Sequence, residues 1–153
     1  PGTLRKMTTT TVPFGAAPWG DLTHSSRAVR VGDVIQIAGT VFPADSASDE
    51  VEGCFGIIGE AIKAAGGRGL EDVVLTRMVA GDVVGDLGEL AAAHKKVFSA
   101  VGVEPAQTTF GGTLVRDTLK VEIEATEVVT HDPPTVKQSR RVPKRGCAQP
   151  SKE

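Results

Sequence analysis

The chain has 153 residues, of which 40% are apolar and 24% charged, an ordinary composition for one globular domain. It contains no apolar run long enough to span a membrane, and we expect a cytoplasmic protein without a secretory leader. Cys54 and Cys147 stand far apart and the three histidines are scattered, so we expect neither a disulfide framework nor a metal site.

Charge is distributed unevenly along the chain. Residues 1–130 carry 11 Lys and Arg against 17 Asp and Glu, whereas residues 131–153 carry 6 against 2. The acidic body disfavours nucleic acid as a partner, because phosphate binding needs a clustered basic face. We divide the chain into a leader and irregular segment (1–22, with Trp19 as its anchor), a folded domain (23–130) and a basic tail (131–153). The tail is either a partner-binding arm or a solubilising extension.

Two strands and a helix open the predicted domain. Residues 25–31 and 34–41 have strand character, and the Gly-Asp pair between them is typical of a hairpin. A helix is then expected from Asp49, which we place at the N-cap, to a stop at Gly66. Apolar residues recur at helical spacing between these two points.

A buried strand and a second helix follow. Residues 72–81 are rich in valine, which favours a buried strand. Asp86 is expected to open a helix that ends at Gly102 and carries His94 in its apolar stripe. A structural role for His94 is favoured over a catalytic one, because no nucleophile is matched to it.

The last two predicted strands span residues 108–114 and 119–129. Strict alternation in the second predicts a strand with one buried face. Glu122 and Glu124 therefore share the opposite face. That face either meets water or lines a polar pocket, and the alternation leaves both open.

The predicted order is ββαβαββ, an α+β fold with both helices on one face of a mixed sheet. At this point the chain resembles the Rid family, also called the YjgF/YER057c/UK114 family, over about residues 23–129. The resemblance rests on segments in the family's order: residues 26–33, 38–40, 69–74, 98, 105–106 and 121–125.

This resemblance implies a chorismate-mutase-like fold assembled as a homotrimeric barrel, with small-molecule pockets between neighbouring subunits. The best-known members hydrolyse enamines and imines to 2-oxo acids and ammonia without a metal or cofactor. Their signature is an arginine directly after a Pro-Ala pair, which holds the substrate carboxylate through two parallel hydrogen bonds.

The chain departs from the family at several of the implied pocket positions. Gln107 stands where the family has that arginine. The other positions that the resemblance assigns to ligand binding are also changed, namely Ser25, Ala38, Ala91 and Thr109. Glu122 is retained, and the resemblance gives it the role of positioning a water near the imine carbon.

Three functions are compatible with these departures: hydrolysis of a neutral or differently charged ligand with help from Glu122, binding of a small metabolite without chemistry, and an interaction scaffold. Losing a hydrogen bond to a charged group costs roughly 1.5–3 kcal/mol. We therefore expect weak or no activity on simple 2-imino acids unless Arg27 or Arg116 supplies the cation. The ribonuclease activity attached to the family is disfavoured by the acidic body.

Overall fold

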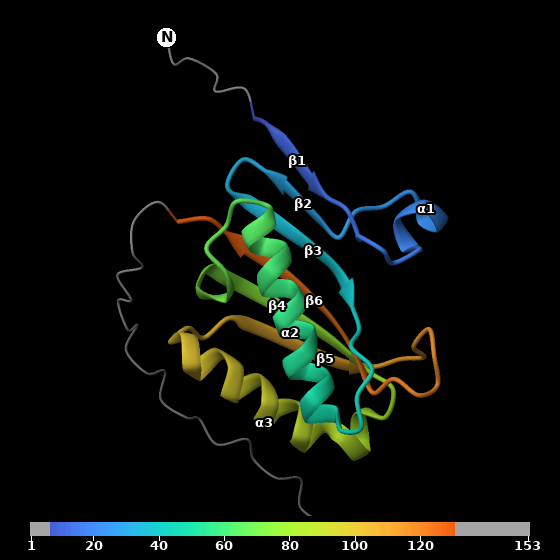
Figure 1. The fold of residues 1–153 in the computed structure, drawn as a ribbon. Coiled ribbons are helices and arrows are strands. Elements are labelled where there is room, and N and C mark those ends of the chain that lie inside the picture. The colour runs from blue at the N-terminus through green and yellow to red at the C-terminus, as the bar shows by residue number, and fades with distance from the viewer. Residues whose placement is uncertain (1–6, 131–153) are drawn as a thin grey trace, which may run out of the picture.

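The computed structural model describes residues 7–130 (Figure 1). Its elements, in chain order, are β1 (Thr9–Val12), α1 (Trp19–Thr23), β2 (Ala28–Val31), β3 (Val34–Thr40), α2 (Ala47–Ala64), the 3-10 helix η1 (Leu70–Asp72), β4 (Val73–Ala80), α3 (Val83–Val101), β5 (Ala106–Gly111) and β6 (Val121–Val128). The predicted ββαβαββ order is confirmed from β2 to β6. The predictions for the leader up to residue 6 and for the basic tail lie outside the described residues.

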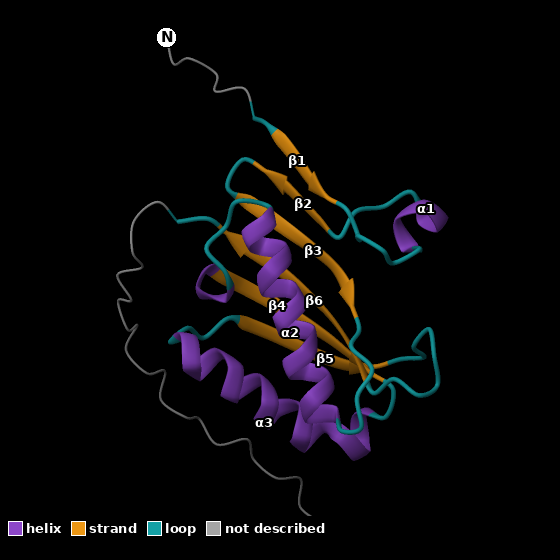
Figure 2. Cartoon of the chain, viewed as in Figure 1, coloured by secondary structure: helices purple, strands orange, loops and turns teal. Residues whose placement is uncertain are grey.

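The strands form one mixed sheet in the order β1-β2-β3-β6-β4-β5. Only β4 and β5 run parallel, and the other neighbours are antiparallel. Helices α2 and α3 lie on the same face of this sheet, with α3 beside the edge strand β5 (Figures 1 and 2). The described part of the chain places no helix over the opposite face (Figure 2). The predicted α+β architecture is therefore confirmed.

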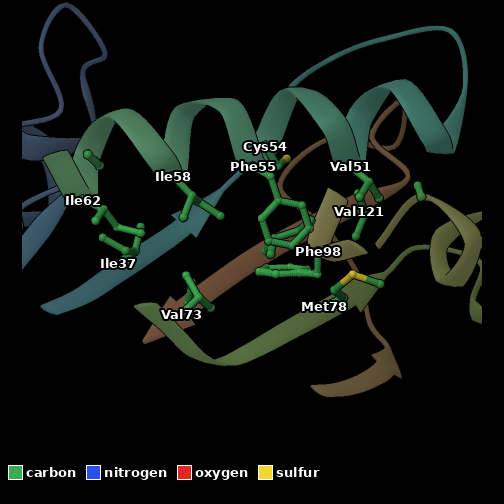
Figure 3. Packing of buried hydrophobic residues seen from close by; sticks show 14 of the residues in the cluster. Ile37, Val51, Cys54, Phe55, Ile58, Ile62, Val73, Met78, Phe98 and Val121 are labelled. Atoms are coloured by element: carbon green, nitrogen blue, oxygen red, sulfur yellow. The ribbon is translucent and has the colours of Figure 1, made fainter. Parts of the chain in front are cut away.

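The hydrophobic core lies between the two helices and the covered face of the sheet. Val121, Ile123 and Ala125 alternate inward from β6 and are at most 2% exposed, as their period-2 spacing predicts. Phe55 of α2 meets Phe98 of α3 edge to face, with ring centroids 5.0 Å apart (Figure 3). This aromatic contact fixes α3 against α2 and so positions the helix that borders β5.

Both long helices begin earlier than predicted. Ser46, not Asp49, is the N-cap of α2: its Oγ accepts the backbone N–H of Asp49 at 3.0 Å and donates to Asp49 Oδ2 at 2.8 Å. Asp82, not Asp86, caps α3 and accepts the backbone N–H of Gly85. A capping side chain bonds an N–H two or three residues later, so the acid of the first turn is easily mistaken for the cap.

The N-terminal segment is more ordered than predicted. Thr9–Val12 forms β1 and pairs antiparallel with β2, and Trp19–Thr23 forms α1. The segment predicted to be irregular thus contains a short helix, and the threonines before it form an edge strand, which suits β-branched residues. Trp19 is only partly buried and is not a core residue.

Candidate functional site

A groove of about 630 Å³ runs between α3 and the edge strand β5. Its lining residues come from α3, from the segment that follows it and from β5, which is the edge strand of the sheet. Its lining residues are Leu87, Ala91, His94, Lys95, Phe98, Ser99, Val103, Glu104, Pro105, Gln107 and Thr109. The volume falls in the range of roughly 300–1,000 Å³ that ligand sites occupy.

Three of the predicted ligand-binding residues meet in this groove. Gln107 and Thr109 pair with Thr76 and Met78 of β4, which are buried on the helix-covered face, so both point to that face. Gln107 Nε2 donates a hydrogen bond to Thr109 Oγ1. Ala91 lines the groove from α3. The interaction between Gln107 and Thr109 fixes the amide beside the hydroxyl.

His94 forms part of the wall of the same groove. Its Nε2 and the hydroxyl of buried Thr76 are hydrogen-bonded at 2.9 Å. Its ring packs against those of Phe98 and Phe55, with centroids 4.6 and 5.7 Å away. Burial lowers the pKa of His94, so the ring is mostly neutral at pH 7. Sequence reasoning placed His94 among packing positions but missed its place in the groove.

Glu122 lies on the other face of the sheet. It pairs with Val79 of β4, between the inward-facing neighbours Val121 and Ile123, so its side chain points away from the helices. Gln107 points toward them. Within one chain, the sheet therefore separates the predicted catalytic residue from the groove.

The carboxylate of Glu122 lies directly against Gly39. A Cβ on Gly39 would come 2.0 Å from Glu122 Oε1, so the carboxylate keeps this position only beside a glycine and would have to move beside any other residue. Burial raises the pKa of Glu122, and the charge of Glu124 on the same face raises it further. Ala38, another predicted pocket position, directly precedes this contact.

Arg27 lies on the Gly39 side of the sheet. Its Nη1 donates to Thr40 Oγ1 at 3.0 Å and to the carbonyl of Gly39 at 3.4 Å, and its guanidinium covers the Phe14 ring at 4.4 Å. Among the described residues it forms no ion pair. Arg116, the other candidate cation, belongs to a separate hollow of about 790 Å³ at the start of α3.

Ser25 lies apart from both groups. It lines a third hollow, of about 410 Å³, with residues of the N-terminal segment such as Phe14. The six predicted site residues are thus divided among the α3/β5 groove, the Gly39 side of the sheet and this hollow.

Sequence reasoning missed two buried acids. Glu50 Oε2 accepts the backbone N–H groups of Lys120 and Val121 at 2.8 and 3.1 Å. Glu127 is 0% exposed, and neither of its carboxylate oxygens has a hydrogen-bond partner among the described residues. Burial raises its pKa to about 7, with further contributions from nearby carboxylates. The alternation of β6 could have revealed Glu127, since it has the parity of Val121.

The described residues contain no group of His, Cys, Asp and Glu side chains that could hold a metal ion. None of the described helices is both long and apolar enough to cross a membrane.

Neither protein-family models nor curated proteins match this sequence. Solved structures do. Rv2704 of Mycobacterium tuberculosis, a member of the YjgF/YER057c/UK114 family, has 29% identity and a TM-score of 0.73, covering 80% of this chain and 100% of its own. NMB1025 of Neisseria meningitidis, a YjgF family member, has 22% identity and a TM-score of 0.69, with coverage of 84% and 100%. The YjgF gene product of E. coli has 20% identity and a TM-score of 0.64, with coverage of 77% and 93%.

These similarities define a mixed α+β protein with the YjgF-like fold. The chain is similar in fold to members of the YjgF/YER057c/UK114 family, the family that its sequence resembles.

Proposed function

We propose that this protein is a homotrimer that binds a small molecule between neighbouring subunits and has weak or no activity on simple 2-imino acids. The observation that carries the proposal is the placement of Gln107 and Glu122 on opposite faces of one sheet. A ligand in contact with both residues therefore requires two copies of the chain. A pocket between subunits, which the family resemblance implies, meets this requirement.

The uncovered face of the sheet has the character of an assembly surface. Val31 and Val34 pair across β2 and β3 on this face, and they are 39% and 44% exposed in the single chain. Gln36 and Thr126, on the same face, hydrogen-bond to each other across β3 and β6. Apolar side chains beside satisfied polar pairs suit a surface that is covered in an oligomer.

Such a site would bind a substrate carboxylate weakly. Gln107 is uncharged and cannot form the two charged hydrogen bonds that an arginine gives a carboxylate. Glu122 keeps a raised pKa, which makes its carboxylate a better base toward a bound water. The proposed site can therefore assist a hydrolysis but holds a 2-imino acid poorly.

Release of ammonia and 2-oxo acid from freshly generated 2-iminopropionate tests this proposal. We expect the native protein to match buffer, the Gln107→Arg variant to accelerate hydrolysis, and the double variant Gln107→Arg with Glu122→Gln to lose that gain. Native activity well above buffer would contradict the proposal, as would a Gln107→Arg gain that survives without Glu122.

An active imine deaminase is the second candidate, and Arg27 is the observation that favours it. The guanidinium is partly buried without an ion pair among the described residues, and it donates to the same Gly39 that contacts Glu122. If Arg27 holds the substrate carboxylate, native activity is present and Arg27→Gln abolishes it.

A further inference from the structure

We propose that the α3/β5 groove recognises an uncharged carboxamide, either an open-chain amide or a lactam, through the side-chain amide of Gln107. The inference rests on the proposed small-molecule site and gives its ligand a chemical class. The groove's position, lining and hydrogen bonds support it.

Gln107 keeps hydrogen-bonding capacity that the protein does not use. An amide side chain has two N–H donors and one carbonyl acceptor. One N–H is used by Thr109 Oγ1, so the carbonyl Oε1 and the second N–H remain. A carboxamide can satisfy both groups at once, because it also presents one acceptor and one donor. A carboxylate presents acceptors only, so it would leave Oε1 facing a negative oxygen.

Uncharged polar groups lie beside Gln107 in the groove. Three polar groups of its lining are uncharged, namely the amide of the exposed Gln107, the hydroxyl of the half-buried Thr109 and the ring of His94. The His94 ring is mostly neutral because burial lowers its pKa, and its Nδ1 has no hydrogen-bond partner among the described residues. These groups favour a ligand that donates and accepts hydrogen bonds without carrying a charge.

The groove also has an apolar lining and no net charge. The apolar part of the lining comes from Leu87, Ala91, Phe98, Val103 and Pro105. The two charged side chains in the lining, Lys95 and Glu104, have opposite signs. The groove therefore has no net charge to attract an anion, and it offers apolar surface for a hydrocarbon substituent of the ligand.

Arg27 does not alter this conclusion for the groove. Its guanidinium is held by Thr40, the carbonyl of Gly39 and the Phe14 ring, and it is not among the groove-lining residues. Within one chain, an anion on Arg27 and an amide on Gln107 would occupy different places.

A pair of matched probes tests the inference on the full chain. Isobutyramide and isobutyrate have the same shape, and their binding is followed by shifts of the backbone amide resonances along β5 and α3. We expect isobutyramide to shift residues around Gln107 and Phe98 saturably. Isobutyrate should bind at least about tenfold more weakly, a factor that corresponds to roughly 1.4 kcal/mol. Because both probes are compared on the native protein, this test does not depend on whether a variant folds.

Substitutions at Gln107 then assign the preference. Gln107→Glu keeps the shape but removes the N–H donors, and it should weaken isobutyramide binding at least about tenfold. Gln107→Arg should reverse the preference toward isobutyrate. Lys63→Gln changes the net charge by the same unit as Gln107→Glu on the exposed side of α2, and it should leave both affinities unchanged.

Equal binding of the two probes, or tighter binding of isobutyrate, would overturn the inference. If isobutyrate binding is lost in Arg27→Gln, Arg27 is the recognition residue instead. If the protein is a trimer but binds no isobutyramide up to the solubility limit of the probe, the inference is overturned while the proposed trimeric assembly stands. A chain that stays monomeric would overturn the proposed function whatever the probes show.

Discussion

Gly39 and Glu122 touch across two neighbouring strands, because the glycine leaves the space that the carboxylate occupies. A methyl group at Gly39 would come 2.0 Å from Glu122 Oε1 and must displace it. The pair explains why a glycine stands beside the retained glutamate. It also makes the position of Glu122 testable without changing Glu122 itself.

Gly39→Ala should destabilise the protein by about 1 kcal/mol or less, the low end of the cost of overpacking, because the atom that the methyl group meets is the end of a flexible side chain. Any turnover gained by Gln107→Arg should fall when Gly39→Ala is added, because the carboxylate has moved. Gly56→Ala is the matched control: no atom lies within 4 Å of its added Cβ. In the middle of α2 that change should stabilise the helix by about 0.5–1 kcal/mol. Urea unfolding measures both, and equal effects of the two substitutions would contradict the contact.

Glu127 should make stability depend on pH near neutrality. Its ordinary pKa of 4.5 is raised to about 7 in the folded state, first by burial and then by Asp72 and Glu71, with Arg30 opposing. Between these values the folded state keeps a proton that the unfolded state has lost, so stability falls as pH rises from 4.5 to 7.

The Glu127→Gln substitution tests this dependence. The variant should gain stability relative to the native protein when pH is raised from 5 to 8, as measured by urea unfolding at both values. Glu60→Gln, on a side chain that is 76% exposed, is the control and should change the profile little. Parallel native and Glu127→Gln profiles would show that the carboxyl group does not titrate in this window.

Asp72 should act at lower pH and in the opposite direction. It accepts hydrogen bonds from Arg68 and Thr130, and the bond from Arg68 is the main cause that lowers its pKa. Its stabilisation is therefore present above the ordinary pKa of 3.8 and is lost as pH falls below it. In the Asp72→Asn variant, the free energy of unfolding should depend less on pH below about pH 4, as measured by urea unfolding. An unchanged dependence on pH in this range would argue against the interaction between Arg68 and Asp72.

Ser46→Ala should destabilise the protein by about 0.5–2 kcal/mol, because it removes the N-cap of α2. Ser48→Ala, one residue into the helix, is the control, since only the backbone N–H of Ser48 bonds to Glu89. Thermal unfolding of the two variants separates a capping effect from a general effect of losing a hydroxyl. Similar losses in both would mean that Ser46 is not the cap.

Local patterns predicted most of the fold. The alternation of β6 correctly placed Glu122 on the face opposite Val121 and Ile123. The prediction that α3 ends at Gly102 was also correct. The predicted strand ends lie within three residues of the observed ones. These features depend on neighbours in sequence, which period and turn chemistry describe well.

Long-range pairing could not be predicted in the same way. The face of Gln107 follows from the parallel pairing of β5 with β4, and that pairing joins segments on either side of α3. The groove is lined by α3 and by β5, the last strand of the sheet, so it too depends on this pairing. The alternation of β6 does assign Glu127 to the covered face, but the residue was overlooked because a charged side chain is normally exposed.

The mass of the full chain in solution, measured by light scattering during size-exclusion chromatography, tests the central claim most directly. The claim is that Gln107 and Glu122, on opposite faces of one sheet, complete a site only between two copies. It predicts an assembly of about three times the chain mass of 15.9 kDa, with probe-induced shifts on both sides of the sheet. A 15.9 kDa species that binds its probe saturably would contradict it.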